Sequence, residues 1–137
     1  SRGYGMVPDE TTDRVIASCF KVHKALGAGF LEKVYENALV MELARNGLTA
    51  RQQVPISVKY EGVLVGEYFA DILVDERVIL ELKANESLSK EHEVQLVNYL
   101  AATGFDTGLL INFGKSVTVK RKFREYKNRQ GEHNSQD

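Results

Sequence analysis

The stretch Tyr68-Phe-Ala-Asp-Ile-Leu-Val-Asp-Glu-Arg-Val-Ile-Leu-Glu-Leu-Lys83 has the pattern of two apolar strands joined by a short polar turn. Side chains along a strand point alternately to its two faces, so Glu81 and Lys83 share one face of the second strand. Asp71 is an isolated acid among the apolar residues of the first strand. Charged side chains are rarely placed within a sheet unless they are paired or bind a metal ion. This hairpin is therefore the strongest candidate site in the chain.

The length of the turn decides whether Asp71 and Glu81 can act together. A two-residue turn at Asp75 and Glu76 would place them on opposite faces, whereas a three-residue loop over 75–77 would place them directly opposite each other. Directly opposed Cβ atoms lie roughly 4.5–5.5 Å apart, a distance at which two carboxylates repel unless they share a proton or a cation. We therefore predict the three-residue loop, or a bulge, and a site for a hard divalent cation such as Mg²⁺.

The same pattern has a second interpretation, in which Lys83 forms a cross-strand salt bridge with Asp71 or Glu81 and has only a structural role. For a Glu-x-Lys pattern by itself, this structural explanation is the more common one. The isolated acid on the partner strand favours the functional interpretation without excluding the structural one.

The rest of the chain predicts helices on both sides of this hairpin. Apolar residues at helical spacing predict two helices at the start of the chain and a third that begins after Ser89 and ends at Gly104. The helices are expected over residues 12–26, 31–46 and 90–103, and the strands over 53–60, 63–74, 77–83, 107–113 and 117–123. The order ααβββαββ indicates an α+β fold, with a mixed sheet that contains an antiparallel three-strand meander and is flanked by helices. We expect one domain over residues 9–126, with flexible termini at 1–8 and 127–137.

Composition limits the class of protein. The 137 residues are 43% apolar, which suits one domain with a real core. The single cysteine, Cys19, excludes an intramolecular disulfide and a four-cysteine zinc site. No apolar run approaches the ~20 residues of a membrane span, and no segment resembles a signal peptide. A soluble, cytoplasmic protein without a membrane partner is therefore expected.

Charge is distributed unevenly although the net charge is only −1. Residues 115–129 hold seven basic residues and one acidic residue, so the remainder of the chain is acidic. The polar side of the last predicted strand and the residue after it carry Lys120, Lys122 and Arg124, which we expect to contact backbone phosphates of a nucleic acid without reading its bases. The alternative is a solvated basic segment with no partner.

Two motifs around the hairpin resemble known signatures. The spacing of Asp71 and Glu81-Leu-Lys83 resembles the D…(D/E)xK signature of the PD-(D/E)xK nuclease superfamily, with Ala70 in place of the usual proline. Gln95-Leu-Val-Asn-Tyr99 on the following helix resembles the QxxxY motif of the RecB-like exonuclease branch. Upstream, Gly29-Phe-Leu-Glu32-Lys-Val-Tyr35 resembles the signature of the GxxExxY protein family, a small member of the same superfamily. The resemblance extends over roughly residues 15–123.

The resemblance implies a restriction-endonuclease-like core and a metal-dependent nuclease. Asp71 and Glu81 would bind Mg²⁺ or Mn²⁺ together with the Leu82 carbonyl, and Lys83 would be catalytic. The metal would activate water and polarise the scissile phosphate, while Lys83 positions that water or stabilises the developing charge. DNA is the expected substrate.

The resemblance also implies roles for residues outside the hairpin, each with an ordinary alternative. Glu32 would be an additional metal ligand or water-orienting acid, or else an acid favoured at a helix N-terminus. Gln95 and Tyr99 would support the active site and the nucleic acid, or else be a buried amide and a packing ring. His23 and Tyr35 would be supporting residues, and for both of them packing in the core is the more common role.

Two other functions compete with the nuclease. A nucleic-acid-binding module could keep the fold and cleave poorly, although the intact Asp-Glu-Lys set argues against it. A protein-interaction subunit would suit the small size and acidic body. A homodimer or a larger protein partner is compatible with every one of these functions.

Overall fold

Five strands form a single mixed sheet in the order β1-β2-β3-β4-β5 in the computed structural model, which describes residues 8–127 and 133–134. Strands β3 and β4 pair in parallel through the crossover helix α3, and the other neighbours pair antiparallel. The large elements are α1 (Pro8–Leu26), α2 (Glu32–Arg45), β1 (Ala50–Tyr60), β2 (Val63–Val74), β3 (Val78–Lys83), α3 (Lys90–Thr103), β4 (Thr107–Phe113) and β5 (Val117–Phe123). The predicted α+β fold with an antiparallel meander and flanking helices is confirmed.

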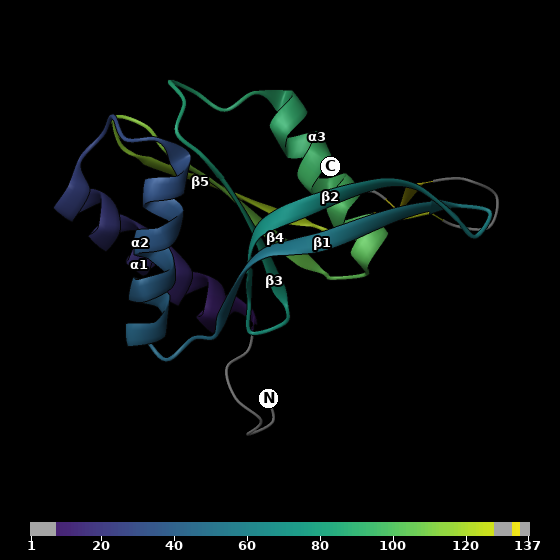
Figure 1. Ribbon diagram of the computed structural model, residues 1–137, viewed down its shortest axis with the longest axis horizontal. Helices are drawn as coiled ribbons and strands as arrows, with labels where there is room; N and C mark the ends of the chain where they lie inside the picture. The colour runs from purple at the N-terminus through teal and green to yellow at the C-terminus, as the bar shows by residue number, and fades with distance from the viewer. Residues whose placement is uncertain (1–7, 128–132, 135–137) are drawn as a thin grey trace.

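Helices cover both faces of the sheet (Figure 1). Helices α1 and α2 pack on one face through a core that includes Cys19, Leu39, Leu80 and Ile111. Helix α3 packs on the other face with Leu96 and Leu100 in a second core. Sheets of this kind are apolar on both faces, so polar side chains that remain in the layer have a specific reason to be there.

Most predicted boundaries agree with the structure to within one residue, and two differ by more. Helix α1 begins at Pro8 rather than residue 12, because proline is well tolerated in the first turn of a helix, where its missing N–H is not needed. Strand β1 begins at Ala50 rather than Gln53, since Ala50 pairs with Val74 at the end of the long partner strand. Helix α3 has the predicted cap, in which the Ser89 side chain accepts a hydrogen bond from the His92 N–H.

A short strand pair lies beyond the main sheet. Strand β6 (Tyr126–Lys127) pairs with β7 (His133–Asn134), in a region that we expected to be a flexible tail. The remainder of that prediction, over residues 1–7, 128–132 and 135–137, lies outside the described residues. Within the described chain, no helix has the length and the apolar character that crossing a membrane requires.

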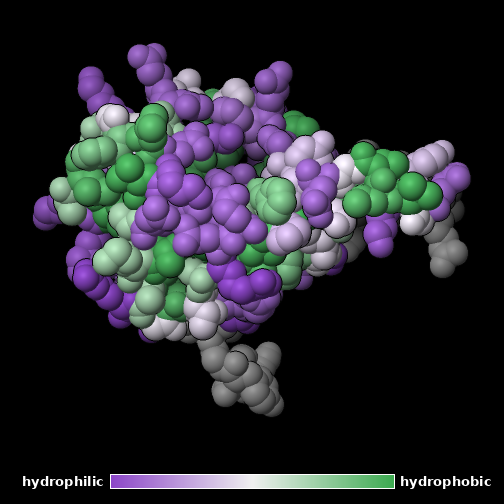
Figure 2. All heavy atoms as spheres, viewed as in Figure 1, coloured by the Kyte–Doolittle hydropathy of each residue, from purple (hydrophilic) through white to green (hydrophobic). Residues whose placement is uncertain are grey.

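The β1–β2 hairpin extends well beyond the rest of the sheet (Figure 1). Strands β2 and β3 are paired only from Val74 and Val78 to Ile72 and Leu80, and from there on β2 continues with β1 alone. Apolar side chains, among them Val63, are exposed near the end of this hairpin (Figure 2). The point where β2 separates from β3 is Asp71.

The hairpin also turns over at this point. Ile72 and Val74 of β2 face the α1–α2 core, whereas Ala70 of the same strand packs beneath α3. In β1, Gln52 pairs with Ile72 and Val54 pairs with Ala70. Gln53 therefore lies opposite Asp71. Its φ of 53° lies in the left-handed region that non-glycine residues seldom adopt. The change of face at Gln53 and Asp71 therefore coincides with the candidate site.

Candidate active site

The loop between β2 and β3 has the predicted three residues, 75–77. Val74 pairs with Val78, and the Arg77 N–H donates to the Val74 carbonyl at 2.9 Å. Asp75 and Glu76 have φ values of 51° and 55°, a conformation usually taken by glycine. The Asp75 carboxylate accepts hydrogen bonds of 2.9 Å from both the backbone N–H and the hydroxyl of Thr49, which helps to hold the loop. Continuation of this register places Asp71 opposite Glu81, as predicted.

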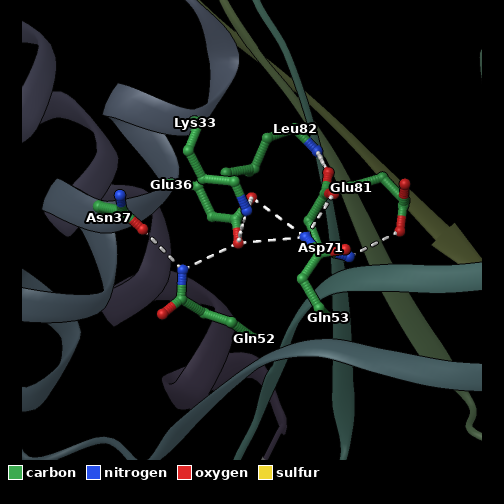
Figure 3. A network of polar contacts seen from close by, with 8 residues as sticks. All are labelled: Lys33, Glu36, Asn37, Gln52, Gln53, Asp71, Glu81 and Leu82. Carbon is green, nitrogen blue, oxygen red and sulfur yellow. Dashed lines mark hydrogen bonds and ion pairs between the residues drawn. The ribbon is translucent and has the colours of Figure 1, made fainter.

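Each of the two opposed carboxylates accepts a hydrogen bond from the other strand (Figure 3). The Leu82 N–H donates to Asp71 Oδ2 at 2.7 Å, and the Asp71 N–H donates to Glu81 Oε2 at 3.1 Å. These bonds satisfy backbone donors where the β2–β3 ladder ends. They also fix both side chains while leaving one oxygen of each carboxylate less constrained, so the pair is preorganised.

Burial and nearby negative charges disfavour ionisation of this pair. The pKa of Glu81 is raised to about 8, first by burial and then by the negative charge of Asp71. The pKa of Asp71 is also raised, mainly by burial, although the hydrogen bond from Leu82 opposes the shift. A cation between the two oxygens would remove the repulsion and favour both charged forms.

Lys83 lies near this pair without neutralising it. Its positive charge lowers the pKa of Glu81 and so acts on that carboxylate. Among the described residues, its ammonium forms no ion pair with Asp71 or Glu81. The structural interpretation, a cross-strand salt bridge, is therefore not what the structure contains.

A buried acid on α2 joins the site and was not expected from the sequence (Figure 3). Glu36 is 3% exposed, and its carboxylate accepts hydrogen bonds from Lys33 at 3.2 Å and from Gln52 at 2.9 Å. Gln53 Nε2 donates to the same carboxylate at 3.2 Å and makes a longer contact of 3.5 Å with Asp71 Oδ1. Gln53 therefore bridges the acid of the helix and the acid of the strand.

The sequence contains only a partial signal for these residues. Glu36 follows Glu32 by four positions and so shares its helix face, which would have allowed either acid to be chosen. Glu32 itself is exposed, and its charge raises the pKa of both Asp71 and Glu81. Gln53 could not have been found, because a left-handed residue within a strand has no signature in a single sequence.

Helix α3 places the predicted Tyr99 near the carboxylate pair, with Gln95 bound to it. Gln95 Nε2 donates to the Tyr99 hydroxyl at 2.6 Å. The pKa of Tyr99 is raised by burial, then by the charge of Glu81 and, more weakly, by that of Asp71, so its hydroxyl lies within electrostatic reach of the pair. The Tyr99 ring also lies against Tyr68 of β2, with 5.6 Å between ring centroids.

His23 and Tyr35 have packing contacts away from the carboxylates. His23 Nε2 is 2.8 Å from the Gly114 carbonyl, and its ring stacks beside Phe113. Tyr35 is fully buried, stacks on Phe113 at 4.6 Å, and donates its hydroxyl proton to the Gly27 carbonyl at 2.6 Å. Tyr35 thereby fixes the turn that leads into α2, the helix that carries Glu36.

The three predicted phosphate contacts differ in their surroundings. Lys120 is exposed on β5, and Leu110 of β4 lies between it and Glu81 in the same row of the sheet. Lys122 Nζ forms an ion pair with Glu93 at 2.9 Å. Arg124 pairs with Asp106 at 2.8 Å and donates to the Gly104 carbonyl at 2.7 Å. Two of the three cations are thus already engaged with acids of the same chain.

The donor set fits a hard cation that is bound partly by water. No cluster of three or more His, Cys, Asp or Glu side chains in metal-binding geometry occurs among the residues that the structure describes. Magnesium does not need one, because it commonly keeps several waters and takes only one or two protein carboxylates together with phosphate oxygens. Asp71 and Glu81 are two carboxylates of the kind that such an ion requires.

Comparisons with known proteins identify a family and several structural neighbours, among them SSO0001 and an alkaline exonuclease. A model of the PD-(D/E)XK nuclease superfamily matches residues 9–125. A crystal structure of SSO0001 superposes with a TM-score of 0.52 at 18% identity, over 68% of this chain and 50% of that chain. The structure of an alkaline exonuclease (LHK-Exo) from Laribacter hongkongensis superposes with a TM-score of 0.52 at 13% identity, over 88% of this chain and 72% of that chain. The curated proteins contain no match.

These structural neighbours share the fold at low sequence identity. This chain spans half the length of SSO0001, so whatever the other half of that protein contributes has no counterpart in the aligned region. The two superpositions support the architecture, and the family match covers the hairpin, both flanking helices α2 and α3, and the last strand.

Proposed function

Because this chain belongs to the PD-(D/E)XK nuclease superfamily, we propose that it is a divalent-metal-dependent nuclease that hydrolyses phosphodiester bonds of DNA. One observation carries the proposal. The three-residue loop places Asp71 opposite Glu81 at the point where two strands separate, and Lys83 stands beside them without an ion pair to either acid. We further propose that the chain is a member of the GxxExxY family, on the basis of residues 29–35.

Asp71 and Glu81 would hold the Mg²⁺ or Mn²⁺ ion through their less constrained oxygens. The Leu82 carbonyl and Glu32 are candidates for additional ligands. The bound ion would polarise the scissile phosphate and lower the pKa of a coordinated water. The two backbone hydrogen bonds keep the carboxylates in place, so little reorganisation is needed when the ion binds.

Lys83 would act on the reacting groups directly. Its ammonium has three donors and can orient a water molecule towards phosphorus or stabilise the negative charge that develops on the phosphate oxygens. Gln95 and Tyr99 would support the DNA strand beside the carboxylates, and Lys120 would contact a phosphate of its backbone. Gln53 would position Asp71 through its side-chain amide, and Glu36 would hold that amide in place.

Cleavage assays test this proposal directly. End-labelled DNA and RNA, single- and double-stranded, are incubated with the wild-type protein in Mg²⁺, in Mn²⁺ and in EDTA. We expect DNA cleavage that requires the metal, is lost in Asp71→Asn, and falls on the order of 10²–10³-fold in Lys83→Met, the size found when one group that stabilises transition-state charge is removed. Glu67→Gln, an exposed acid on β2, is the matched control and should cleave normally.

Four results would contradict the proposal. Cleavage in EDTA would show that the reaction does not need a divalent metal. Undiminished cleavage by Asp71→Asn would show that it does not need the carboxylate pair. Binding of DNA without cleavage in either metal would instead identify a binding module with a nuclease fold. Cleavage of RNA alone would overturn the choice of DNA.

A further inference from the structure

A pocket of about 560 Å³ lies between the outer part of the β1–β2 hairpin and helix α3. The hairpin contributes Tyr68 and Val65, and α3 contributes Gln95, Asn98 and Tyr99. None of the residues that line the pocket is charged. Its walls are therefore aromatic and aliphatic surfaces with a few amide groups, a composition that suits a planar, uncharged and polar-edged group.

Tyr68 provides an aromatic surface in this pocket. Its side chain is 46% exposed, whereas that of Tyr99 is 7% exposed. The two rings lie 5.6 Å apart and are tilted by 38°, so the buried ring supports the exposed one from one side. The Tyr99 hydroxyl is held by Gln95, which fixes the supporting ring. Such a backed and partly exposed ring can stack on another planar group at small entropic cost.

The pocket and the carboxylate pair are adjacent. Tyr68 precedes Asp71 by three residues on one strand, which corresponds to about 10 Å along the chain. Tyr99 lines the pocket and, at the same time, its hydroxyl experiences the charges of Glu81 and Asp71. A DNA strand that has one phosphate at the carboxylates can therefore place a neighbouring base in the pocket.

We propose that this pocket binds an unpaired nucleobase of the strand being cut, with the base stacked on Tyr68, and that the substrate is single-stranded DNA or a frayed DNA end. This inference rests on the proposed nuclease function. The amides of Gln95 and Asn98 can each donate and accept hydrogen bonds, as the edges of all four bases can, which favours stacking without strong sequence preference. A base within a duplex is stacked and paired, and would first have to leave the helix to reach the pocket.

Binding in the absence of metal provides the test. A DNA single strand that carries 2-aminopurine, whose fluorescence falls on stacking, is titrated with protein in EDTA. We expect quenching by the wild type and weaker binding by Tyr68→Ala, about 5- to 150-fold, as found when an aromatic platform for one base is removed. Tyr68→Phe keeps the ring and should bind like the wild type. Ala101→Leu fills the pocket from the exposed side of α3 and should weaken binding.

Tyr60→Ala is the matched control, because Tyr60 is an exposed tyrosine of the same hairpin that does not line the pocket. The proposal is overturned if Tyr68→Ala binds the single strand as well as the wild type does, or if Tyr60→Ala weakens binding equally. It is also overturned if Tyr68→Ala weakens binding to a DNA duplex as much as it weakens binding to the single strand. It is also overturned if Tyr68→Ala changes only the sedimentation behaviour of the protein, since the pocket would then serve a protein contact.

The design separates this inference from the nuclease proposal. The titration contains no metal and needs no turnover. Quenching in the titration without any cleavage in the cleavage assay would therefore support the base-binding pocket and contradict the nuclease proposal. Metal-dependent cleavage that is unaffected by Tyr68→Ala on single strands would keep the enzyme and reject the pocket.

Discussion

Glu81 illustrates how one side chain can be costly for the fold and useful for the site. Burial and the adjacent Asp71 both act against its ionisation and raise its pKa to about 8. The carboxylate is nevertheless held by the Asp71 N–H at 3.1 Å rather than released to solvent. Acidic groups of this kind are common at functional sites, where a cation or substrate supplies the missing charge.

This pKa gives a prediction for stability in EDTA. Between pH 4.5 and about 8 the folded protein keeps a proton on Glu81 that the unfolded chain releases. The folded state thus binds more protons in this window, so the contribution of Glu81 to the free energy of unfolding is present below pH 4.5 and is lost as the pH rises through about 8. Urea unfolding of wild type and Glu81→Gln from pH 5 to 9 measures it.

We expect the wild type to lose stability relative to Glu81→Gln as the pH rises. Saturating Mg²⁺ should reduce that loss in the wild type, because the ion binds the ionised carboxylate. Parallel pH profiles for the two proteins in EDTA would show that Glu81 titrates normally and would contradict the description of the pair.

The residues of the site could be predicted from the sequence where spacing along strands determined them. Alternation left two turn lengths open, and the expectation of a shared cation selected the three-residue loop that the structure contains. Ser89 marked the start of α3 correctly. Glu36 and Gln53 could not be found in this way. Their convergence depends on the change of face at Asp71 and on a left-handed residue within β1, and both arise from tertiary packing.

At the scale of elements, the turns of the meander have an unusual feature: non-glycine residues adopt positive φ. In the β2–β3 loop, Asp75 is held by Thr49, and Glu76 forms an ion pair with Arg51 at 2.7 Å. In the β1–β2 turn, Glu61 has a φ of 50° ahead of Gly62 with a φ of 81°. These two values fit a type I′ hairpin turn, which prefers Asn-Gly.

Glu61→Asn should therefore stabilise the protein by about 0.5–1 kcal/mol, because asparagine adopts the left-handed conformation at lower cost than glutamate. Chemical denaturation at neutral pH measures the difference. Glu86→Asn, at an exposed position without positive φ, makes the same chemical change and should have no comparable effect. A loss of stability in Glu61→Asn would indicate that the glutamate side chain contributes to the turn.

The elements themselves were predictable because each has a local signal. The borders of β2, α3, β4 and β5 agree with the prediction, since each coincides with a change of periodicity or with a turn residue. The start of β1 and the pair β6–β7 were not predictable, because strand pairing depends on a partner that is distant in sequence.

At the scale of the whole molecule, charge separates two kinds of basic residue along β5. Lys120 is exposed, while Lys122 is paired with Glu93 and Arg124 with Asp106. A cation that already has an acid partner gains less from a phosphate, since it must give up that partner. The basic strand is therefore expected to bind nucleic acid through fewer contacts than its composition suggests.

Salt dependence measures these contacts one at a time. If Lys120 contacts a phosphate, Lys120→Ala should reduce the slope of log K against log salt for a DNA single strand by about 0.7. Lys122→Ala serves as the comparison and should change the slope less. Equal slopes for wild type and Lys120→Ala would place the nucleic acid on another surface.

The arrangement of the whole chain connects these features. The sheet holds Asp71, Glu81 and Lys83 between α2, which supplies Glu36, and α3, which supplies Tyr99. The projecting hairpin adds a pocket on the α3 side. A single strand could thus pass the carboxylates with one base held beside them.

The central claim is that Asp71 and Glu81 form a metal site. Its most direct test is Mn²⁺ binding, monitored through the loss of the EPR signal of the free ion. The wild type, Asp71→Asn and the control Glu67→Gln are titrated side by side, with circular dichroism to confirm folding. The account predicts binding by wild type and Glu67→Gln and its loss in Asp71→Asn. Equal binding by wild type and Asp71→Asn, or no binding by a folded wild type even with DNA present, would contradict it.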